Sequence, residues 1–256
     1  MNDMFNLQGK LAVVMGGTST LGSTMALGLA QSGADIVLTG RNEEKASFIL
    51  EEIRQNGVSA NFIKTDVRDN DSIKNAADVI DKEFGGWDIL INSAGVNSST
   101  PFFDIDKDEW DSIMDVNLKS VMFTCQEFAR KNKVRERGGS VINISSVSSI
   151  KPLTKVVTYS ASKAGINSIT EFMAQELASD NIRVNAIIPG FFPAEQNRKI
   201  LTEDRVKAIM DHTPMKRFGS PEELQGAVIW LASEKAAGFV TGSMVTVDGG
   251  FGATKI

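Results

Sequence analysis

The run Lys10-Leu-Ala-Val-Val-Met-Gly16-Gly-Thr-Ser-Thr-Leu-Gly22 decides the fold of this chain. Its first six residues form an apolar, branched segment of strand length, and residues 23–32 carry apolar side chains at helical spacing. A strand, a glycine turn and a helix in this order let the backbone approach a phosphate closely, while the helix amides supply positive potential. The run therefore predicts a dinucleotide site; a tight turn without a ligand is the alternative.

The same alternation of buried strands and helices continues along the chain. Strands are expected near 10–16, 35–40, 60–65, 88–92, 139–145, 182–188 and 243–248, and helices near 21–32, 43–55, 70–84, 107–131, 157–179 and 221–232. Short loops and right-handed crossovers join such elements into an α/β fold, a single doubly wound, Rossmann-like parallel sheet of about seven strands with helices on both faces.

The length of 256 residues fits one domain, 1–256. Its cofactor half would span about 9–140, and its catalytic and substrate half about 141–256. Residues 190–219 are the least regular part and are expected to form a lid over the active site.

Tyr159 and Lys163 lie four residues apart in the helix expected at 157–179. This spacing places a phenol beside an ammonium on one helix face. A free tyrosine titrates near ~10, and a neighbouring positive charge lowers that pKa. Such a tyrosine can give a proton to a carbonyl oxygen or take one from a hydroxyl, which is the proton half of a carbonyl–alcohol redox reaction. The alternative is a surface tyrosine packed on a lysine stem.

Several further motifs follow in chain order. They are Thr65-Asp66-Val67, Ile91-Asn92-Ser93-Ala94-Gly95, Val116-Asn117-Leu118, Asn143-Ile-Ser-Ser146, Pro189-Gly190 and Val247-Asp-Gly-Gly250. Together with the glycine turn and the Tyr159/Lys163 pair, they make the chain from Gly9 to Gly252 resemble a short-chain dehydrogenase/reductase of the classical type. It departs from that family's motifs at Met15, Thr20 and Ser93, where the family carries Thr, Gly and Asn.

The resemblance implies a catalytic tetrad of Asn117, Ser146, Tyr159 and Lys163. Tyr159 would be the acid/base, and Lys163 would lower its pKa and hold the nicotinamide ribose. Ser146, favoured over Ser145 by its spacing to Tyr159, would hydrogen-bond the substrate oxygen, and Asn117 would hold a water that relays protons to Lys163. Ser146 as a plain strand end and Asn117 as a mid-helix hydrogen-bonding residue are the alternatives.

The resemblance also implies a nicotinamide cofactor, with Asp66 contacting its adenine. The expected cofactor-binding residues are Gly16, Thr18, Ser19, Thr20, Leu21, Gly22, Arg41, Asp66, Val67, Asn92, Ala94, Gly95, Tyr159, Lys163, Pro189 and Gly190. A carboxylate closing the second strand would repel a 2′-phosphate, but this chain has Thr39-Gly40-Arg41-Asn42 there. Because arginine suits phosphate recognition, NADP(H) is favoured. NAD(H) is the alternative if Arg41 pairs with Glu43 or Glu44.

The substrate prediction depends on the run Pro189-Gly-Phe-Phe-Pro-Ala-Glu-Gln-Asn-Arg198. Gln196, Asn197 and Arg198 suit a hydroxylated carboxylate, with amides for hydroxyls and an arginine for the acid. This run and His212-Thr-Pro-Met-Lys-Arg-Phe-Gly219 resemble sugar-acid members of the family, namely D-mannonate oxidoreductase (fructuronate reductase) and gluconate 5-dehydrogenase. We therefore expect hydride transfer between the cofactor and a sugar acid.

Three other interpretations of the chain remain open. The polar residues after Pro193 could form a solvated helix. The chain could be a 3-oxoacyl-thioester (acyl-carrier-protein) reductase, with an apolar site lined by Phe191, Phe192, Met210 and Met215. It could also be a non-catalytic dinucleotide sensor, although a binding module needs no general acid.

Composition argues against several other classes. The net charge is −5, from 27 basic and 32 acidic residues, with no basic block, so nucleic acid is not an expected partner. No apolar stretch could span a bilayer, and the N-terminus lacks the features of a signal peptide, which predicts a cytoplasmic protein.

The single cysteine and the single histidine restrict the chemistry further. Cys125 has no disulfide partner and suits core packing. His212 lies far from any nucleophile turn, and no His/Cys cluster has zinc spacing, so neither a hydrolytic triad nor a metal site is expected. His212 would lie at the surface or line the substrate mouth. The family resemblance implies a homotetramer or homodimer, formed partly by helices 107–131 and 157–179.

Overall fold

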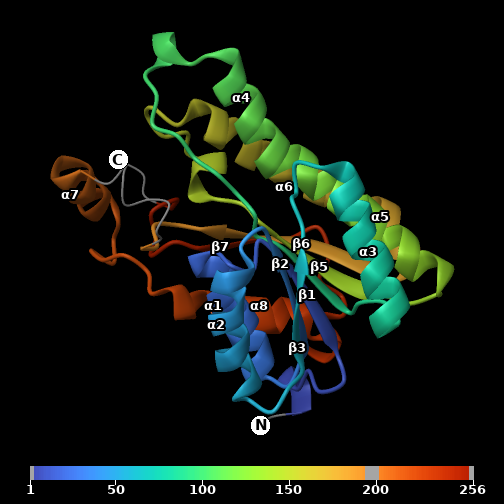
Figure 1. Ribbon diagram of the computed structural model, residues 1–256. Helices are drawn as coiled ribbons and strands as arrows, with labels where there is room; N and C mark the ends of the chain where they lie inside the picture. Colours follow the sequence, from blue (N-terminus) through green and yellow to red (C-terminus); the bar gives the residue numbers. More distant parts are fainter. Residues whose placement is uncertain (1–2, 194–201, 254–256) are drawn as a thin grey trace.

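The computed structural model describes residues 3–193 and 202–253 (Figure 1). In this part of the chain, seven parallel strands form one sheet in the order β3-β2-β1-β4-β5-β6-β7. The strands are β1 (Leu11–Met15), β2 (Asp35–Gly40), β3 (Ala60–Lys64), β4 (Ile89–Asn92), β5 (Gly139–Ile144), β6 (Ile182–Pro189) and β7 (Met244–Val247). The order reverses between β1 and β4, and in such sheets ligands bind beyond the carboxyl ends of the strands at this switch point.

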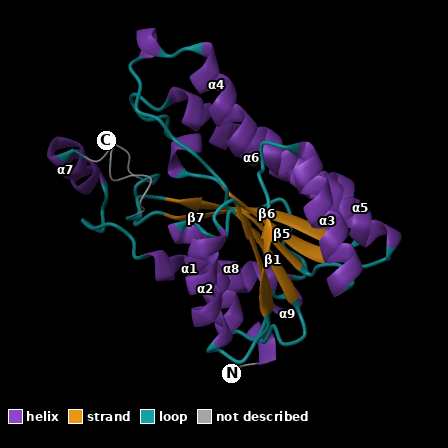
Figure 2. Cartoon of the chain, viewed as in Figure 1, coloured by secondary structure: helices purple, strands orange, loops and turns teal. Residues whose placement is uncertain are grey.

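Helices cover both faces of the sheet (Figure 2). One face carries α1 (Thr20–Gln31), α2 (Glu43–Arg54) and α8 (Gln225–Ala232), and the other carries α3 (Asn70–Phe84), α5 (Ser120–Val134) and α6 (Val157–Leu177). Each face has its own buried apolar cluster, because the strand side chains alternate between the two layers. All five side chains of β1 are buried, as expected for a central parallel strand. The predicted α/β fold is confirmed.

The long helix predicted over 107–131 is interrupted in the structure. It consists of α4 (Lys107–Met114), a π-helical turn (Asp115–Lys119) and α5, which ends at Val134. A π turn inserts one extra residue and is found frequently at functional sites. Here it carries Asn117, whose backbone position is therefore shifted relative to a continuous α-helix.

The segment predicted to be least regular, 190–219, contains a helix that was not predicted, α7 (Glu203–His212). Thr202 caps it, because its hydroxyl accepts a hydrogen bond from the Arg205 amide, and Glu203 and Asp204 lie in the first turn. The start predicted at Ser220-Pro221 is confirmed, although the first turn, Pro221–Leu224, is a 3₁₀ helix that leads into α8. A last short helix, α9, spans Glu234–Ala237.

The buried positions explain several side chains that the sequence singled out. Cys125 is 1 % exposed, and burial raises the pKa of its thiol to about 12, which confirms the core-packing interpretation. Ile166 and Ile169 of α6 face the sheet core, whereas Phe172 is 53 % exposed. No helix in the described ranges is both long enough and apolar enough to cross a membrane.

Candidate active site

The glycine turn between β1 and α1 lies at the carboxyl end of β1. Gly16 has φ +73°, and a Cβ there would lie 2.7 Å from both the Cα and the backbone N of Ala94, so only glycine fits without a shift. A Cβ on Gly22 would lie 2.5 Å from the Gly16 carbonyl oxygen. Ser19 closes the turn, because its hydroxyl donates to the Gly16 carbonyl (2.9 Å) and accepts from the Gly22 amide (3.1 Å). The turn thereby leaves the backbone amides at the N-terminus of α1 accessible, as phosphate binding at a helix N-terminus requires.

Two family departures in this region have local explanations. Thr20, in place of a glycine, is the first residue of α1 and lines the cavity beside the turn. Ser93, in place of an asparagine, donates from its hydroxyl to the Met15 carbonyl at 2.7 Å and so joins the end of β4 to the end of β1. Neither replacement obstructs the glycine turn.

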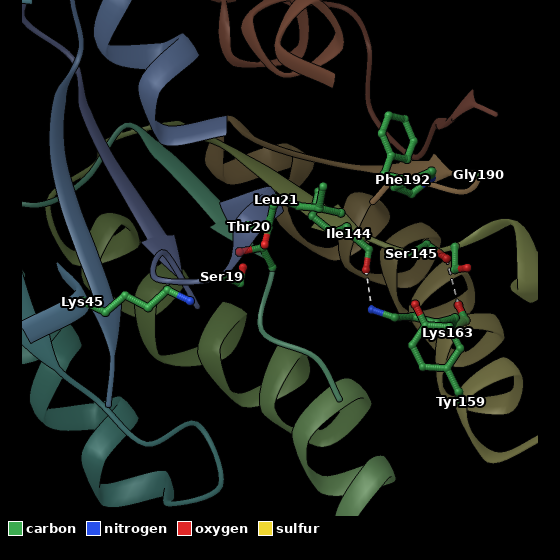
Figure 3. Close-up of a pocket in the computed structure, with 13 residues that line it drawn as sticks. Ser19, Thr20, Leu21, Lys45, Ile144, Ser145, Tyr159, Lys163, Gly190 and Phe192 are labelled. Atoms are coloured by element: carbon green, nitrogen blue, oxygen red, sulfur yellow. Dashed lines mark hydrogen bonds between the residues drawn. The ribbon is translucent and has the colours of Figure 1, made fainter. Parts of the chain in front are cut away.

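Ser146, Tyr159 and Lys163 lie together in a cavity of about 340 Å³ that extends to the glycine turn. Figure 3 shows Ser19, Thr20 and Leu21 on one side of this cavity and Tyr159 and Lys163 on the other. The Lys163 ammonium donates to the Ile144 carbonyl at 2.7 Å and lies 5.6 Å from the centroid of the Tyr159 ring. The predicted pairing of phenol and ammonium is therefore present.

Burial controls the acidities of these two groups. It raises the pKa of Tyr159 above its ordinary value near 10, and a hydrogen bond with Ser146 partly opposes the rise. Burial also lowers the pKa of Lys163 to about 8. The lowering of the tyrosine pKa expected from the lysine charge is not found in this structure, where burial is the largest effect on the pKa and raises it. The Ser146 bond agrees with the preference for Ser146 over Ser145, whose hydroxyl instead donates to the Lys163 carbonyl.

Asn117 holds the loop that follows β4. Its amide nitrogen donates to the Val96 carbonyl (2.9 Å) and to the Ser162 hydroxyl (3.1 Å), and its amide oxygen accepts from the Val96 amide (2.8 Å). The structure thus shows a hydrogen-bonding role for this side chain between the loop and α6. The proton-relaying water expected beside Asn117 remains a prediction.

A wider groove of about 870 Å³ continues from the glycine turn along the ends of β2 and β3. Eight of the expected cofactor residues line it, namely Gly16, Thr18, Ser19, Arg41, Asp66, Val67, Ala94 and Gly95, and Ser19 also lines the catalytic cavity. Leu21, Pro189 and Gly190 line the catalytic cavity instead. Asp66 forms a 2.6 Å ion pair with Arg68, which lowers the pKa of the carboxyl to about 2.

Asn92 differs from the other expected cofactor residues. Its side chain is buried at the end of β4, where the amide donates to the Asn143 amide oxygen (2.9 Å) and to the Cys125 sulfur (3.3 Å). It lines neither the groove nor the catalytic cavity, so the structure gives it a supporting position beneath the site.

Comparison with known proteins agrees with this geometry. The family model described as enoyl-(acyl carrier protein) reductase, a short-chain dehydrogenase type, matches residues 16–252. The chain belongs to the short-chain dehydrogenase/reductase family. It is 38 % identical to the 2-dehydro-3-deoxy-D-gluconate 5-dehydrogenase of Escherichia coli strain K12, with 96 % of this chain and 97 % of that protein covered. It is 35 % identical to the 5-keto-D-gluconate 5-reductase of the same strain, with 98 % of each covered.

A solved structure shows the same likeness in three dimensions. The gluconate 5-dehydrogenase of Burkholderia cenocepacia J2315, crystallised in complex with NADP and tartrate, superimposes with a TM-score of 0.94 at 35 % identity, covering 99 % of each chain. This member of the short-chain dehydrogenase/reductase family is accordingly an oxidoreductase.

Four polar residues of this short-chain dehydrogenase/reductase line its cavities but were not singled out in the sequence. Lys45 borders both the catalytic cavity and the nucleotide groove, and its place in the first turn of α2, four residues after Arg41, could have indicated this. Arg68 borders the groove two residues after Asp66. Asn97 and Arg205 line a recess beside Ser146. Asn97 lies in the loop after β4 and Arg205 in the first turn of α7, and no sequence pattern connects them.

The substrate residues expected at Gln196, Asn197 and Arg198 lie outside the described residues. Of the four apolar residues named for a thioester site, Phe191 and Phe192 line the recess beside Ser146 and also a neighbouring cavity that Met215 lines. His212 ends α7 and packs edge-on against Phe251, with ring centroids 4.5 Å apart.

Proposed function

We propose that this oxidoreductase transfers a hydride between NADP(H) and the carbonyl or secondary alcohol of a sugar acid, of the gluconate/5-ketogluconate or mannonate/fructuronate type. The proposed redox chemistry is inferred from one observation. Ser146, Tyr159 and Lys163 line the same cavity as the glycine turn and face that turn. A phosphate-binding turn beside a proton donor is what carbonyl reduction by a nicotinamide requires. NAD(H) is the alternative cofactor.

The chain's own residues supply binding and proton transfer. The glycine turn fits a dinucleotide, since a Cβ at Gly16 or Gly22 would fill the space that the backbone approach needs. When bound, the nicotinamide supplies or accepts the hydride. Tyr159 gives its phenolic proton to the carbonyl oxygen during reduction and takes a proton from the hydroxyl during oxidation. Ser146 hydrogen-bonds that oxygen, and Lys163 holds the ribose and lowers the tyrosine pKa in the complex. Asn117 holds the relaying water.

Arg41 supports the choice of NADP(H). It lies at the end of β2, lines the groove, and forms no ion pair with Glu43 or Glu44 in the described structure. The groove is lined by three cationic side chains, Arg41, Lys45 and Arg68, and by two carboxylates. An unpaired guanidinium at this position suits a 2′-phosphate. The relative from Burkholderia cenocepacia was crystallised with NADP.

The proposed substrate class has two supports. The relatives named above act on gluconate derivatives, and one was crystallised with tartrate, a hydroxylated dicarboxylate. Gln196, Asn197 and Arg198 supply two amides and a guanidinium, groups that suit hydroxyls and a carboxylate. We propose these three, together with Ser146, as substrate contacts.

Two other functions are alternatives to the sugar-acid oxidoreductase. A 3-oxoacyl-thioester reductase is favoured by one observation, the aromatic wall of Phe191, Phe192 and Phe218 beside Ser146. A non-catalytic dinucleotide sensor would not require Ser146, Tyr159 and Lys163 to share one cavity, so the arrangement of these three side chains argues against it.

We also propose a domain organisation and an oligomeric state for the protein. We propose one domain over 1–256, with a cofactor half (about 9–140), a catalytic half (about 141–256) and a lid over 190–219, in a cytoplasmic homotetramer or homodimer. The exposed Phe172 of α6 and the 40 % exposed Trp110 of α4 support an interface that involves these two helices.

The experiment is a spectrophotometric assay at the nicotinamide band. Purified protein is given NADPH or NADH together with fructuronate, tagaturonate, 5-ketogluconate or an acetoacetyl thioester. Turnover of a keto-sugar acid supports the proposal. Turnover of the thioester alone would replace it with the reductase alternative, and cofactor binding without any turnover would favour the sensor.

A further inference from the structure

A small recess leads off the catalytic cavity. It has a volume of about 60 Å³ and shares Ser146, Tyr159, Gly190 and Phe192 with that cavity. Since one water-sized group needs ~10–15 Å³, the recess holds about four to six such groups. A substrate whose reacting carbonyl lies at Ser146 and Tyr159 would extend the far end of its carbon chain into this space.

Asn97 presents a buried acceptor to the recess. The residue is half-buried, and its amide oxygen is shielded from solvent and accepts no hydrogen bond from any described residue. The loop position is fixed nearby, because Asn117 bonds the adjacent Val96 through both its amide and its carbonyl. Leaving a buried acceptor unsatisfied is unfavourable. A ligand hydroxyl is a donor that would satisfy it.

Arg205 presents a cation to the same recess. It lies in the first turn of α7, is half-buried, and its guanidinium makes no ion pair or hydrogen bond with a described residue. Most other arginines in the described ranges are paired to a carboxylate or carbonyl; they are Arg54, Arg68, Arg130, Arg135, Arg137, Arg183 and Arg217. The exceptions are Arg41 in the nucleotide groove and Arg205 in the recess. The two unpaired guanidinium groups thus lie in the two places where the proposed reaction brings an anion.

We propose that Arg205 and Asn97 recognise the acid end of the substrate. The Arg205 guanidinium binds the carboxylate, and the Asn97 amide oxygen accepts a hydrogen bond from a hydroxyl on a nearby carbon. A carboxylate with its adjacent hydroxyl-bearing carbon matches the size of the recess, and Leu153, Val156 and Phe218 pack against the carbon chain. This assignment rests on the proposed sugar-acid activity and specifies which side chains of the described structure select the acid.

The test compares an acid substrate with its neutral counterpart. L-sorbose is 5-ketogluconate with the carboxylate replaced by CH₂OH, and D-fructose has the same relation to fructuronate. In Arg205→Gln we expect kcat/KM for the keto acid to fall roughly 10–100-fold, mainly through KM, with little change for the neutral ketose. Lys207→Gln is the matched control, because it removes the same charge from an exposed position on the same helix. Its kinetics should equal those of the wild type.

A second measurement does not depend on turnover of the ketose. Inhibition by the product acid, gluconate, should weaken at least tenfold in Arg205→Gln and stay unchanged in Lys207→Gln. Asn97→Ala should lower kcat/KM about tenfold for both acid and neutral substrates, because the lost bond is to a hydroxyl. A wild-type enzyme active on the keto acid, with Arg205→Gln as active as Lys207→Gln, overturns this inference alone. A wild-type enzyme inactive on every keto-sugar acid overturns the proposed function.

Discussion

The Lys163 ammonium donates a 2.7 Å hydrogen bond to the backbone carbonyl of Ile144. This bond links α6, which carries Tyr159, to the end of β5, two residues before Ser146. The Ser145 hydroxyl adds a second link by donating to the Lys163 carbonyl at 3.1 Å. Ser146, proposed to bind the substrate oxygen, and Tyr159, proposed to move its proton, are thus held in register by Lys163.

Tyr159→Phe removes the proposed proton donor while keeping the ring. We expect kcat for carbonyl reduction to fall roughly 10²–10⁴-fold, the usual contribution of a general acid. Cofactor affinity should change little, and fluorescence titration with NADPH checks that point. A variant that retained wild-type kcat would show that another group protonates the substrate.

Arg41→Ala removes the unpaired guanidinium from the nucleotide groove. We expect the KM for NADPH to rise roughly 10–100-fold, since a charge-assisted bond contributes about 1.5–3 kcal/mol. The KM for NADH serves as the internal control and should stay within about threefold. An equal rise for both cofactors would mean that Arg41 contacts a group common to them.

Lys163→Met tests the burial of the ammonium. Burial lowers the Lys163 pKa from 10.5 to about 8, so between these values the unfolded chain holds a proton that the folded chain releases. The contribution of Lys163 to the free energy of unfolding of the wild type should therefore rise from pH 8 to pH 10.5, by on the order of 3 kcal/mol. Below pH 8 the charged, buried lysine is at its least favourable. Lys163→Met lacks this rise.

Urea unfolding of the two proteins between pH 7 and pH 10.5 measures the difference. Lys207→Met, at an exposed position, is the control and should follow the wild type. Parallel curves for the wild type and Lys163→Met would contradict the buried, shifted lysine.

Most of the fold could be predicted from the sequence because the central strands are apolar runs and helices such as α1, α2 and α3 begin at a capping side chain. The exceptions have physical reasons. The pattern over 107–131 is continuous, so nothing in it marks the π turn that carries Asn117. The helix α7 was missed although Thr202 followed by Glu203 and Asp204 is a helix start.

The site was predictable where a motif keeps its residues close in sequence, as with Tyr159 and Lys163. Asn97 and Arg205 were not, since they belong to a loop and a helix about a hundred residues apart that meet only in the fold. The direction of the Tyr159 pKa shift was also wrong for this structure, because it depends on burial, which spacing does not reveal.

Gly16→Ala and Gly57→Ala distinguish the effect of backbone strain at a positive φ from the effect of a close contact with a neighbouring backbone. Both glycines have positive φ, +73° and +77°, but a Cβ at Gly57 meets nothing within 4 Å, whereas one at Gly16 lies 2.7 Å from Ala94. We expect Gly57→Ala to cost about 1–2 kcal/mol of stability and leave activity unchanged. Gly16→Ala should cost more and weaken NADPH binding, because the Ala94 backbone must move. Thermal unfolding and cofactor titration measure both, and equal effects in the two variants would refute the close approach.

In the proposed reaction, a hydride passes between the nicotinamide and the carbonyl carbon of a sugar acid. NADPH deuterated at the transferring C4 position, incubated with the enzyme and 5-ketogluconate or fructuronate, tests it directly by NMR of the product. We expect one deuterium on the new carbinol carbon, with none in a Tyr159→Phe incubation over the same time. Product without deuterium at that carbon, or no reduction of any keto-sugar acid, would contradict it.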